Sequence, residues 1–162
     1  MLPEDVAAKL RLNAFRTVLG VEPARNGDGA PQSFGLIHEF WQRGVVVTLA
    51  AFATGDLSLY FSNGGGILGG IQHAKVAETV RTTIPLLGPL TAQLERSDSI
   101  EPPAPGEVTF AILTTEGRFR SRLQSMPAND HKDPNFQLLA LSQGLVGELR
   151  KASEGAAGQA GE

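Results

Sequence analysis

Apolar residues recur at helical spacing near the start of the chain. Every fourth position of one stripe is apolar: Val6, Leu10, Ala14 and Val18. This spacing puts the four side chains on one face and predicts a helix over residues 3–19. Pro3 suits the first turn of such a helix, and Gly20 suits a position just beyond its end. Residues 22–32 are rich in proline, glycine and asparagine and predict a loop.

The pattern then changes to that of strands. Residues 33–40 alternate, and the side chains expected on one face are Phe34, Leu36, His38 and Phe40. Residues 45–52 are apolar on both faces, which is typical of a strand in the middle of a sheet. Residues 57–62 alternate again. Short turns at Gly44 and Gly55 join the three strands, so we expect an antiparallel meander.

A second helical pattern covers residues 73–94. Its apolar side chains recur three or four positions apart: Val76, Val80, Ile84 and Leu87. Pro85 and Pro89 cannot continue a helix without loss of hydrogen bonds, so we expect a kink or break near Thr83 and a short second segment after Pro89. Residues 96–106 contain three prolines and predict a loop.

Two further strands and a third helix complete the pattern. Residues 108–114 and 118–123 predict a hairpin whose turn contains Gly117. The pair Asp133-Pro134 is typical of a helix start, because aspartate caps the first turn and proline fits the first helical position. A stripe of leucines then predicts a helix over residues 136–151.

The order of these elements predicts the fold class. Helix, three strands, helix, two strands and helix favour an α+β protein with a single five-stranded, mostly antiparallel sheet flanked by helices. We expect one domain over residues 1–152 and a flexible tail over residues 153–162, which are small or polar. The order resembles that of the roadblock, longin and profilin-like folds, a likeness of topology that carries no functional residue to this chain. Three helices can leave one face of the sheet open, and an open face or a leftover edge strand suits dimerisation.

Composition and charge narrow the classes of function. The chain has 162 residues and a net charge of −3 at pH 7, which argues against nucleic-acid or anionic-membrane binding as its main role. It contains no cysteine, so disulfides and thiolate chemistry are excluded. No apolar run approaches the roughly 20 residues of a membrane-spanning helix, and the first residues lack the pattern of a signal peptide. We therefore expect a soluble cytoplasmic protein.

A glycine-rich run, residues 63–70, joins the third strand to the second helix. It matches the spacing of the dinucleotide fingerprint, but the strands are antiparallel and no acidic residue follows about 20 positions on. The P-loop pattern also fails, because Ile71-Gln72 stands where lysine and serine or threonine are needed. We favour a structural turn in which Gly69 and Gly70 allow close packing. The alternative is an anionic small-molecule site built from these residues: Asn63, Gly64, Gly65, Gly66, Gly69, His73 and Arg81.

A second candidate surface is basic and aromatic. Arg118, Arg120 and Arg122 alternate along the last strand and therefore share one face. They could bind an acidic partner or a phosphate, but we favour a solvated face or a charged edge strand that resists aggregation. Trp41 and Tyr60 would be interface anchors if exposed and core aromatics if buried.

The residues give little sign of catalysis. None of the three histidines has the spacing of a metal site or a catalytic triad, and residues 129–133 match no zinc or calcium pattern, so neither a metal nor a cofactor is predicted. His38 and Glu39 are adjacent in a strand and point to opposite faces. The leading hypothesis is a small non-enzymatic protein-interaction module that forms a homodimer or binds a protein partner. The alternative is a small-molecule or phosphate-binding protein, with or without enzyme activity, that uses the glycine run.

Overall fold

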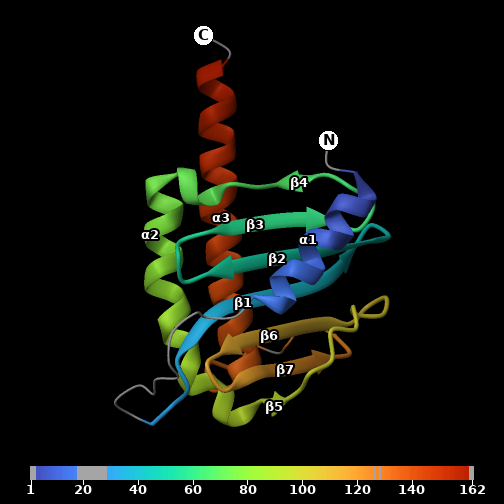
Figure 1. Ribbon diagram of the computed structural model, residues 1–162, viewed down its shortest axis with the longest axis vertical. Coiled ribbons are helices and arrows are strands. Elements are labelled where there is room, and N and C mark those ends of the chain that lie inside the picture. Colours follow the sequence, from blue (N-terminus) through green and yellow to red (C-terminus); the bar gives the residue numbers. More distant parts are fainter. Residues whose placement is uncertain (1–2, 18–28, 126, 128, 161–162) are drawn as a thin grey trace.

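The computed structural model describes residues 3–17, 29–125, 127 and 129–160, with side chains described as far as residue 155. In this part of the chain, helices surround a seven-stranded antiparallel sheet (Figure 1). The α-helices are α1 (Glu4–Arg16), α2 (Ala74–Thr83) and α3 (Pro134–Ala160), and the 3-10 helices are η1 (Gly70–Gln72) and η2 (Ile84–Gln93). The strands are β1 (Ser33–Gln42), β2 (Val45–Phe52), β3 (Leu57–Phe61), β4 (Gly66–Ile67), β5 (Glu95–Arg96), β6 (Val108–Thr114) and β7 (Gly117–Leu123).

The α+β class and the antiparallel sheet are confirmed, but the predicted number of five strands is wrong. The strand order is β4-β3-β2-β1-β6-β7-β5, so the five predicted strands form the centre and a two-residue strand is added at each edge. β4 pairs with β3, and β5 pairs with β7. Strands of two residues are too short to show alternation in the sequence, which is why neither was predicted.

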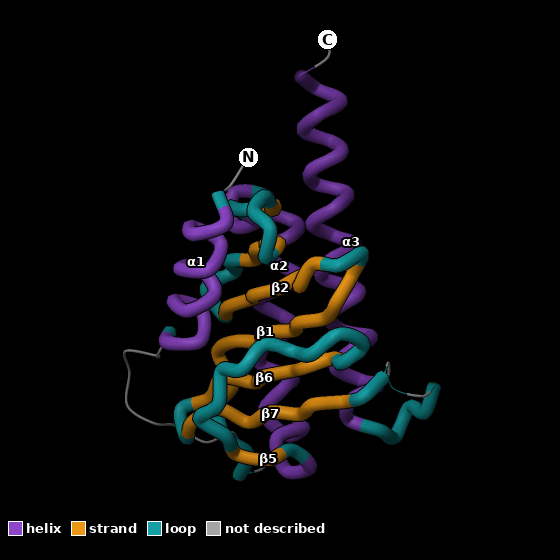
Figure 2. The backbone as a smooth tube through the Cα atoms, turned by 90° about the vertical axis from the view of Figure 1, so that its right-hand side faces the viewer, coloured by secondary structure: helices purple, strands orange, loops and turns teal. Residues whose placement is uncertain are grey.

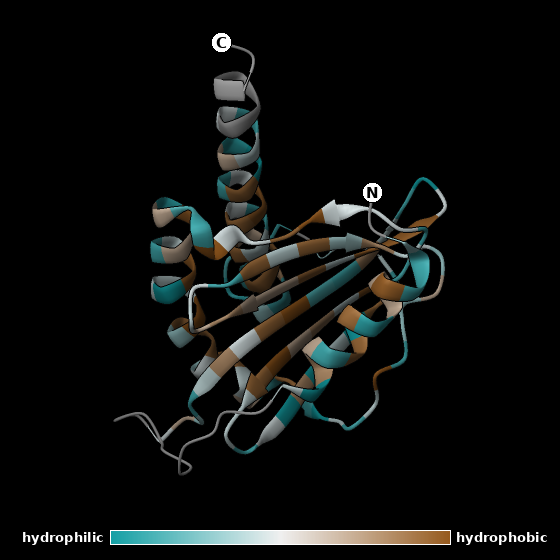
Figure 3. Ribbon diagram, turned by 45° about the horizontal axis from the view of Figure 1, so that its top comes forward, coloured by the Kyte–Doolittle hydropathy of each residue, from teal (hydrophilic) through white to brown (hydrophobic). Residues whose placement is uncertain are grey.

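Each face of the sheet has its own hydrophobic cluster. α2, α3 and η2 pack on one face, around side chains such as Leu49 and Ile112. α1 crosses the other face obliquely and packs Phe15 near Ile37 (Figures 1 and 2). The central strands between these helices are largely hydrophobic (Figure 3). The sheet is therefore the middle layer of three, with helices on both of its faces.

A β-bulge at the start of β1 corrects one detail of the predicted alternation. The register between β1 and β6 shifts between Ser33 and Gly35. As a result Phe34 packs in the α1 cluster, while Leu36 and Phe40 pack in the cluster under α2 and α3. The prediction that these aromatic and aliphatic side chains share one face is wrong for Phe34, because the bulge inserts an extra residue and reverses the alternation there.

The helix ends differ from prediction at both ends of the chain. α1 ends at Arg16, and the rest of its predicted span lies largely outside the described residues, as does most of the predicted loop at 22–32. The predicted break near Thr83 is confirmed, since α2 ends there. The second segment, η2, starts at Ile84 and contains Pro89, so the prediction that it would begin after Pro89 is wrong. α3 runs past the predicted end at Lys151 to Ala160 and projects beyond the sheet (Figure 1). Among the described helices none is both long and apolar enough to cross a membrane.

Two glycines allow β4 and η1 to lie unusually close to β3. A Cβ on Gly66 would lie 2.2 Å from the carbonyl oxygen of Leu59, and a Cβ on Gly70 would lie 2.6 Å from the carbonyl oxygen of Leu57. Both distances are far below van der Waals contact, so only glycine fits. Gly69 differs, because its φ of 75° is left-handed but a Cβ there would meet no atom closer than 3.6 Å.

This difference makes a testable prediction about stability. We expect Gly66→Ala and Gly70→Ala each to lower the free energy of unfolding by about 3 kcal/mol, because β4 or η1 must move away from β3. Gly69→Ala should cost only about 1 kcal/mol, the price of a left-handed alanine. Urea denaturation followed by circular dichroism measures all three. Equal losses in Gly66→Ala and Gly69→Ala would show that close packing on β3 is not the reason for glycine at 66.

Candidate functional site

The edge of the sheet formed by β4 is apolar and carries no charge. β4 pairs with β3 through Gly66 and Ile67, and no other described strand pairs with its outer side. Leu68 and Ile71, which follow β4, are 47% and 43% exposed. Residues 63–72 contain no charged side chain. The opposite edge, β5, consists of Glu95 and Arg96, a charged pair of the kind that protects an edge strand from association.

Some of the predicted anion-binding residues make hydrogen bonds within the protein. The N–H of Gly64 donates to the carbonyl oxygen of Phe61 within the turn. His73 stands before α2 and makes no side-chain capping hydrogen bond. The side chain of Arg81 is used in the turn between β2 and β3. Its Nε donates to the carbonyl oxygen of Thr54 at 3.0 Å, and its guanidinium packs on Gly55. Arg81 therefore holds the turn between β2 and β3.

The three arginines of β7 lie on the face that carries α1, opposite alternate residues of β6. Their guanidinium groups do not form a free basic stripe. They donate to backbone carbonyl oxygens of the segment after β5: Arg118 to Asp98 (2.7 Å), Arg120 to Ser99 (2.8 Å) and Glu101 (3.1 Å), and Arg122 to Glu101 (3.2 Å) and Pro102 (3.4 Å). Arg122 also pairs with the carboxylate of Glu107 at 2.9 Å.

Two further side chains complete this set of donors. Arg11 donates from Nη2 to the carbonyl oxygen of Ile100 at 2.7 Å, and Trp41 donates from Nε1 to that of Pro103 at 2.7 Å. Every carbonyl oxygen from residue 98 to residue 103 thus accepts a hydrogen bond from a side chain. We call residues 98–103 the proline segment. Its prolines lack the N–H groups that strand pairing needs, so side-chain donors of the α1 face hold it in place instead.

Glu39 is the buried centre of this face. Its carboxylate is fully buried and accepts hydrogen bonds from Arg11 (Nε at 2.6 Å and Nη2 at 2.9 Å) and from the hydroxyl of Thr48 at 2.8 Å. Burial lowers the pKa of the nearby Arg120, and the negative charge of Glu39 opposes that shift. Sequence reasoning missed Glu39, because an acidic residue in an alternating strand is expected to face solvent.

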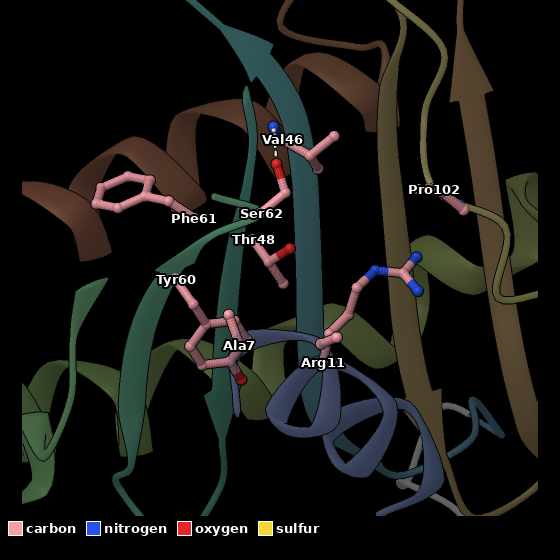
Figure 4. Close-up of a pocket in the computed structure, with 9 residues that line it drawn as sticks. Ala7, Arg11, Val46, Thr48, Tyr60, Phe61, Ser62 and Pro102 are labelled. Carbon is pink, nitrogen blue, oxygen red and sulfur yellow. Dashed lines mark hydrogen bonds between the residues drawn. The ribbon is translucent and has the colours of Figure 1, made fainter. Parts of the chain in front are cut away.

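A cavity of about 210 Å³ lies beside this ion pair, between α1 and strands β2 and β3 (Figure 4). Its lining residues come from four parts of the chain: Ala7, Ala8, Arg11, Val46, Thr48, Tyr60, Phe61, Ser62 and Pro102. Tyr60 is buried, and burial raises the pKa of its phenol, with smaller contributions from the charges of Asp56 and Glu39. In the single chain Tyr60 is therefore a core aromatic. Trp41 is half-buried, and its ring N–H is hydrogen-bonded to the proline segment.

His38 lies on the other face of β1, as predicted from the alternation with Glu39. Its Nδ1 is 3.2 Å from the carbonyl oxygen of Thr109. Because a carbonyl oxygen only accepts, Nδ1 carries the hydrogen and Nε2 is left as an acceptor in the neutral ring. The ring stacks on Phe110 with centroids 4.4 Å apart. Burial lowers the pKa of His38 to about 4, although the hydrogen bond to Thr109 opposes the shift, so the ring is neutral at pH 7.

Comparisons with known proteins add no candidate site. No three histidine, aspartate or glutamate side chains gather as a metal site within the described part of the chain. Asp133 caps α3 by accepting the N–H of Asn135 at 2.9 Å, the role predicted for it. No family model, no curated protein and no solved structure matches this chain.

The Glu39–Arg11 pair makes a prediction about stability. Glu39→Gln removes the negative charge and leaves the part-buried guanidinium of Arg11 without its counter-charge. We expect it to lower the free energy of unfolding by about 3 kcal/mol. Glu78→Gln, at an exposed position of α2, is the matched control and should change stability by less than about 0.5 kcal/mol. Urea titrations at pH 7 compare the two. A loss in Glu39→Gln no larger than in the control would contradict a structural role for the pair.

His38 makes a prediction about pH. Its pKa is about 4 in the folded chain and about 6.5 when unfolded, so between these values only the unfolded state binds the proton. The contribution of His38 to the free energy of unfolding is complete above pH 6.5. It falls as the pH drops from 6.5 to 4 and becomes constant below pH 4. The loss attributable to His38 should be roughly 3 kcal/mol. His38→Phe keeps an aromatic ring at this position but cannot bind a proton, so its free energy of unfolding should lack this dependence on pH. Denaturation curves at several pH values test it, and parallel pH profiles for the two proteins would refute it.

Proposed function

We propose that this protein is a non-enzymatic interaction module that associates with a second copy of itself along the β4 edge. The observation that carries the proposal is the exposure of Leu68 and Ile71 next to an uncharged edge strand. Large apolar side chains beside unpaired strand groups are the features by which sheet edges associate. We keep the cytoplasm, expected from the sequence, as the compartment in which the module works.

The absence of charge along residues 63–72 favours a second copy over a charged partner. A two-fold interface brings the same patch of both copies together, so any charge on it would face its own like charge unless it were offset. An uncharged, glycine-rich edge avoids that repulsion.

Other surfaces offer weaker support for a partner. The guanidinium groups of Arg118, Arg120 and Arg122 already donate to the proline segment, so an acidic partner would have to compete with those bonds. The alternative of a small-molecule or phosphate site at the glycine run remains a prediction. Close packing on β3 accounts for Gly66 and Gly70 without a ligand, and Arg81 is directed elsewhere.

The proposal predicts the effect of charge at the edge. Leu68→Asp combined with Ile71→Asp should convert a dimer into a monomer, because two carboxylates per copy would meet their equivalents across the two-fold axis. The matched control is Leu86→Asp, which charges a large apolar side chain that is 62% exposed and lies on η2, over β1 and β6. The control should stay dimeric. Size-exclusion chromatography with light scattering, at several protein concentrations, measures the mass of each protein.

Two results would count against this proposal. A wild-type chain that is strictly monomeric at high concentration would remove self-association. A dimer that survives the double substitution but dissociates in Leu86→Asp would place the interface on η2 instead of β4. Thermal melting of all three proteins confirms that the comparison is made between folded chains.

A further inference from the structure

A second cavity lies on the opposite face of the sheet, between β1 and α3. It has a volume of about 310 Å³, within the range of small-ligand sites. Its walls are largely apolar, with a few polar groups among them: His38, Phe40, Leu139, Ser142, Gln143, Val146, Gly147 and Arg150. None of these residues belongs to the β4 edge, so this cavity and the proposed dimer surface are independent.

One buried polar group in this cavity lacks a hydrogen-bond partner within the described part of the chain, and a second polar atom lies on the same wall. Ser142 is 1% exposed, and its hydroxyl has no partner. His38 is 3% exposed and its Nδ1 is bonded to Thr109, so Nε2 is the ring nitrogen that can accept a hydrogen bond from a ligand. Buried polar groups in native proteins are nearly always paired, because an unpaired one loses the hydrogen bonds that water supplied. An unpaired serine hydroxyl that shares a cavity with a histidine ring therefore points to a ligand.

We propose that this cavity binds a small neutral ligand with an apolar body and one hydroxyl group, that is, an aliphatic or aromatic alcohol. A hydroxyl matches both protein groups, since its hydrogen can go to Nε2 of His38 and its oxygen can accept from Ser142. A carboxylate would instead place its negative charge against the lone pair of Nε2, and the cation in the wall, Arg150, has an exposed side chain whose charge water screens. Phe40, Leu139 and Val146 supply the apolar contacts for the body of the ligand.

A larger side chain at Gly147 would enter the cavity and fill it. A Cβ on Gly147 would meet no atom within 4 Å, and the same is true of Gly144 one turn earlier in α3. Gly147 lines the cavity and Gly144 does not. Leucine at either position replaces a helical glycine and should favour the helix. Gly147→Leu and Gly144→Leu therefore form a matched pair that differs in whether the new side chain enters the cavity.

The test is a titration of the full-length chain with 1-hexanol and, separately, with hexanoate. Heteronuclear NMR follows the ring nitrogens of His38 and the methyl groups of Leu139 and Val146. We expect 1-hexanol to shift these signals saturably and to move Nε2 of His38, and hexanoate to bind at least about tenfold more weakly at pH 7. Gly147→Leu should abolish saturable binding and Gly144→Leu should leave it unchanged.

Ser142→Ala gives an independent readout that does not depend on filling the cavity. It removes one hydroxyl and should weaken 1-hexanol roughly 3- to 10-fold while leaving the fold unchanged. The proposal is overturned if 1-hexanol shifts none of these signals, if hexanoate binds as tightly, or if Ser142→Ala binds 1-hexanol as well as the wild type. Equal binding by Gly147→Leu and Gly144→Leu would likewise overturn it, because the ligand would then lie elsewhere.

Discussion

The burial of one carboxylate, that of Glu39, governs the architecture of the α1 face. An ionised group removed from water must be matched by charge and hydrogen bonds, or it destabilises the fold. Arg11 supplies two of these bonds from α1, and Thr48 supplies another from β2. The same guanidinium reaches the carbonyl oxygen of Ile100. A single ion pair thus connects a helix, two strands and the proline segment to each other. These bonds fix the position of α1 on the sheet.

The proline segment shows how a chain can be held against the face of a sheet without forming a strand. Its carbonyl oxygens are bound one after another by arginine and tryptophan side chains, whereas β-pairing would have used backbone N–H groups. Arg11, Arg118 and Arg120 also lie within 5.9 Å of the centroid of the Phe15 ring. Cation–π contacts of this kind add to the hold of the arginines on α1. The arginines that the sequence placed on one face do share that face, and their guanidinium groups bind the proline segment.

Much of the fold could be predicted from the sequence, and the parts that could not share a physical reason. The central strands and the helices were predicted because their periodic patterns extend over five or more residues. β4 and β5 are too short for such a pattern, and the bulge that turns Phe34 over depends on pairing with β6. Among the candidate sites, the common face of Arg118, Arg120 and Arg122 followed from alternation. Their acceptors lie about 20 residues earlier in the chain, and only tertiary folding brings them together. Glu39 looked like a solvent-facing residue for the same reason: nothing local indicates that α1 will cover it.

The two edges of the sheet have opposite chemical character, and this difference limits how such chains can assemble. A sheet whose two edge strands can both pair with another copy can add copies indefinitely and grow into a fibre. Here one margin is apolar and uncharged, while the other ends in a glutamate and an arginine. Once two apolar margins have met, only charged margins face outward. If the chain pairs through its apolar margin, as proposed above, growth by edge-to-edge addition would therefore stop at two copies.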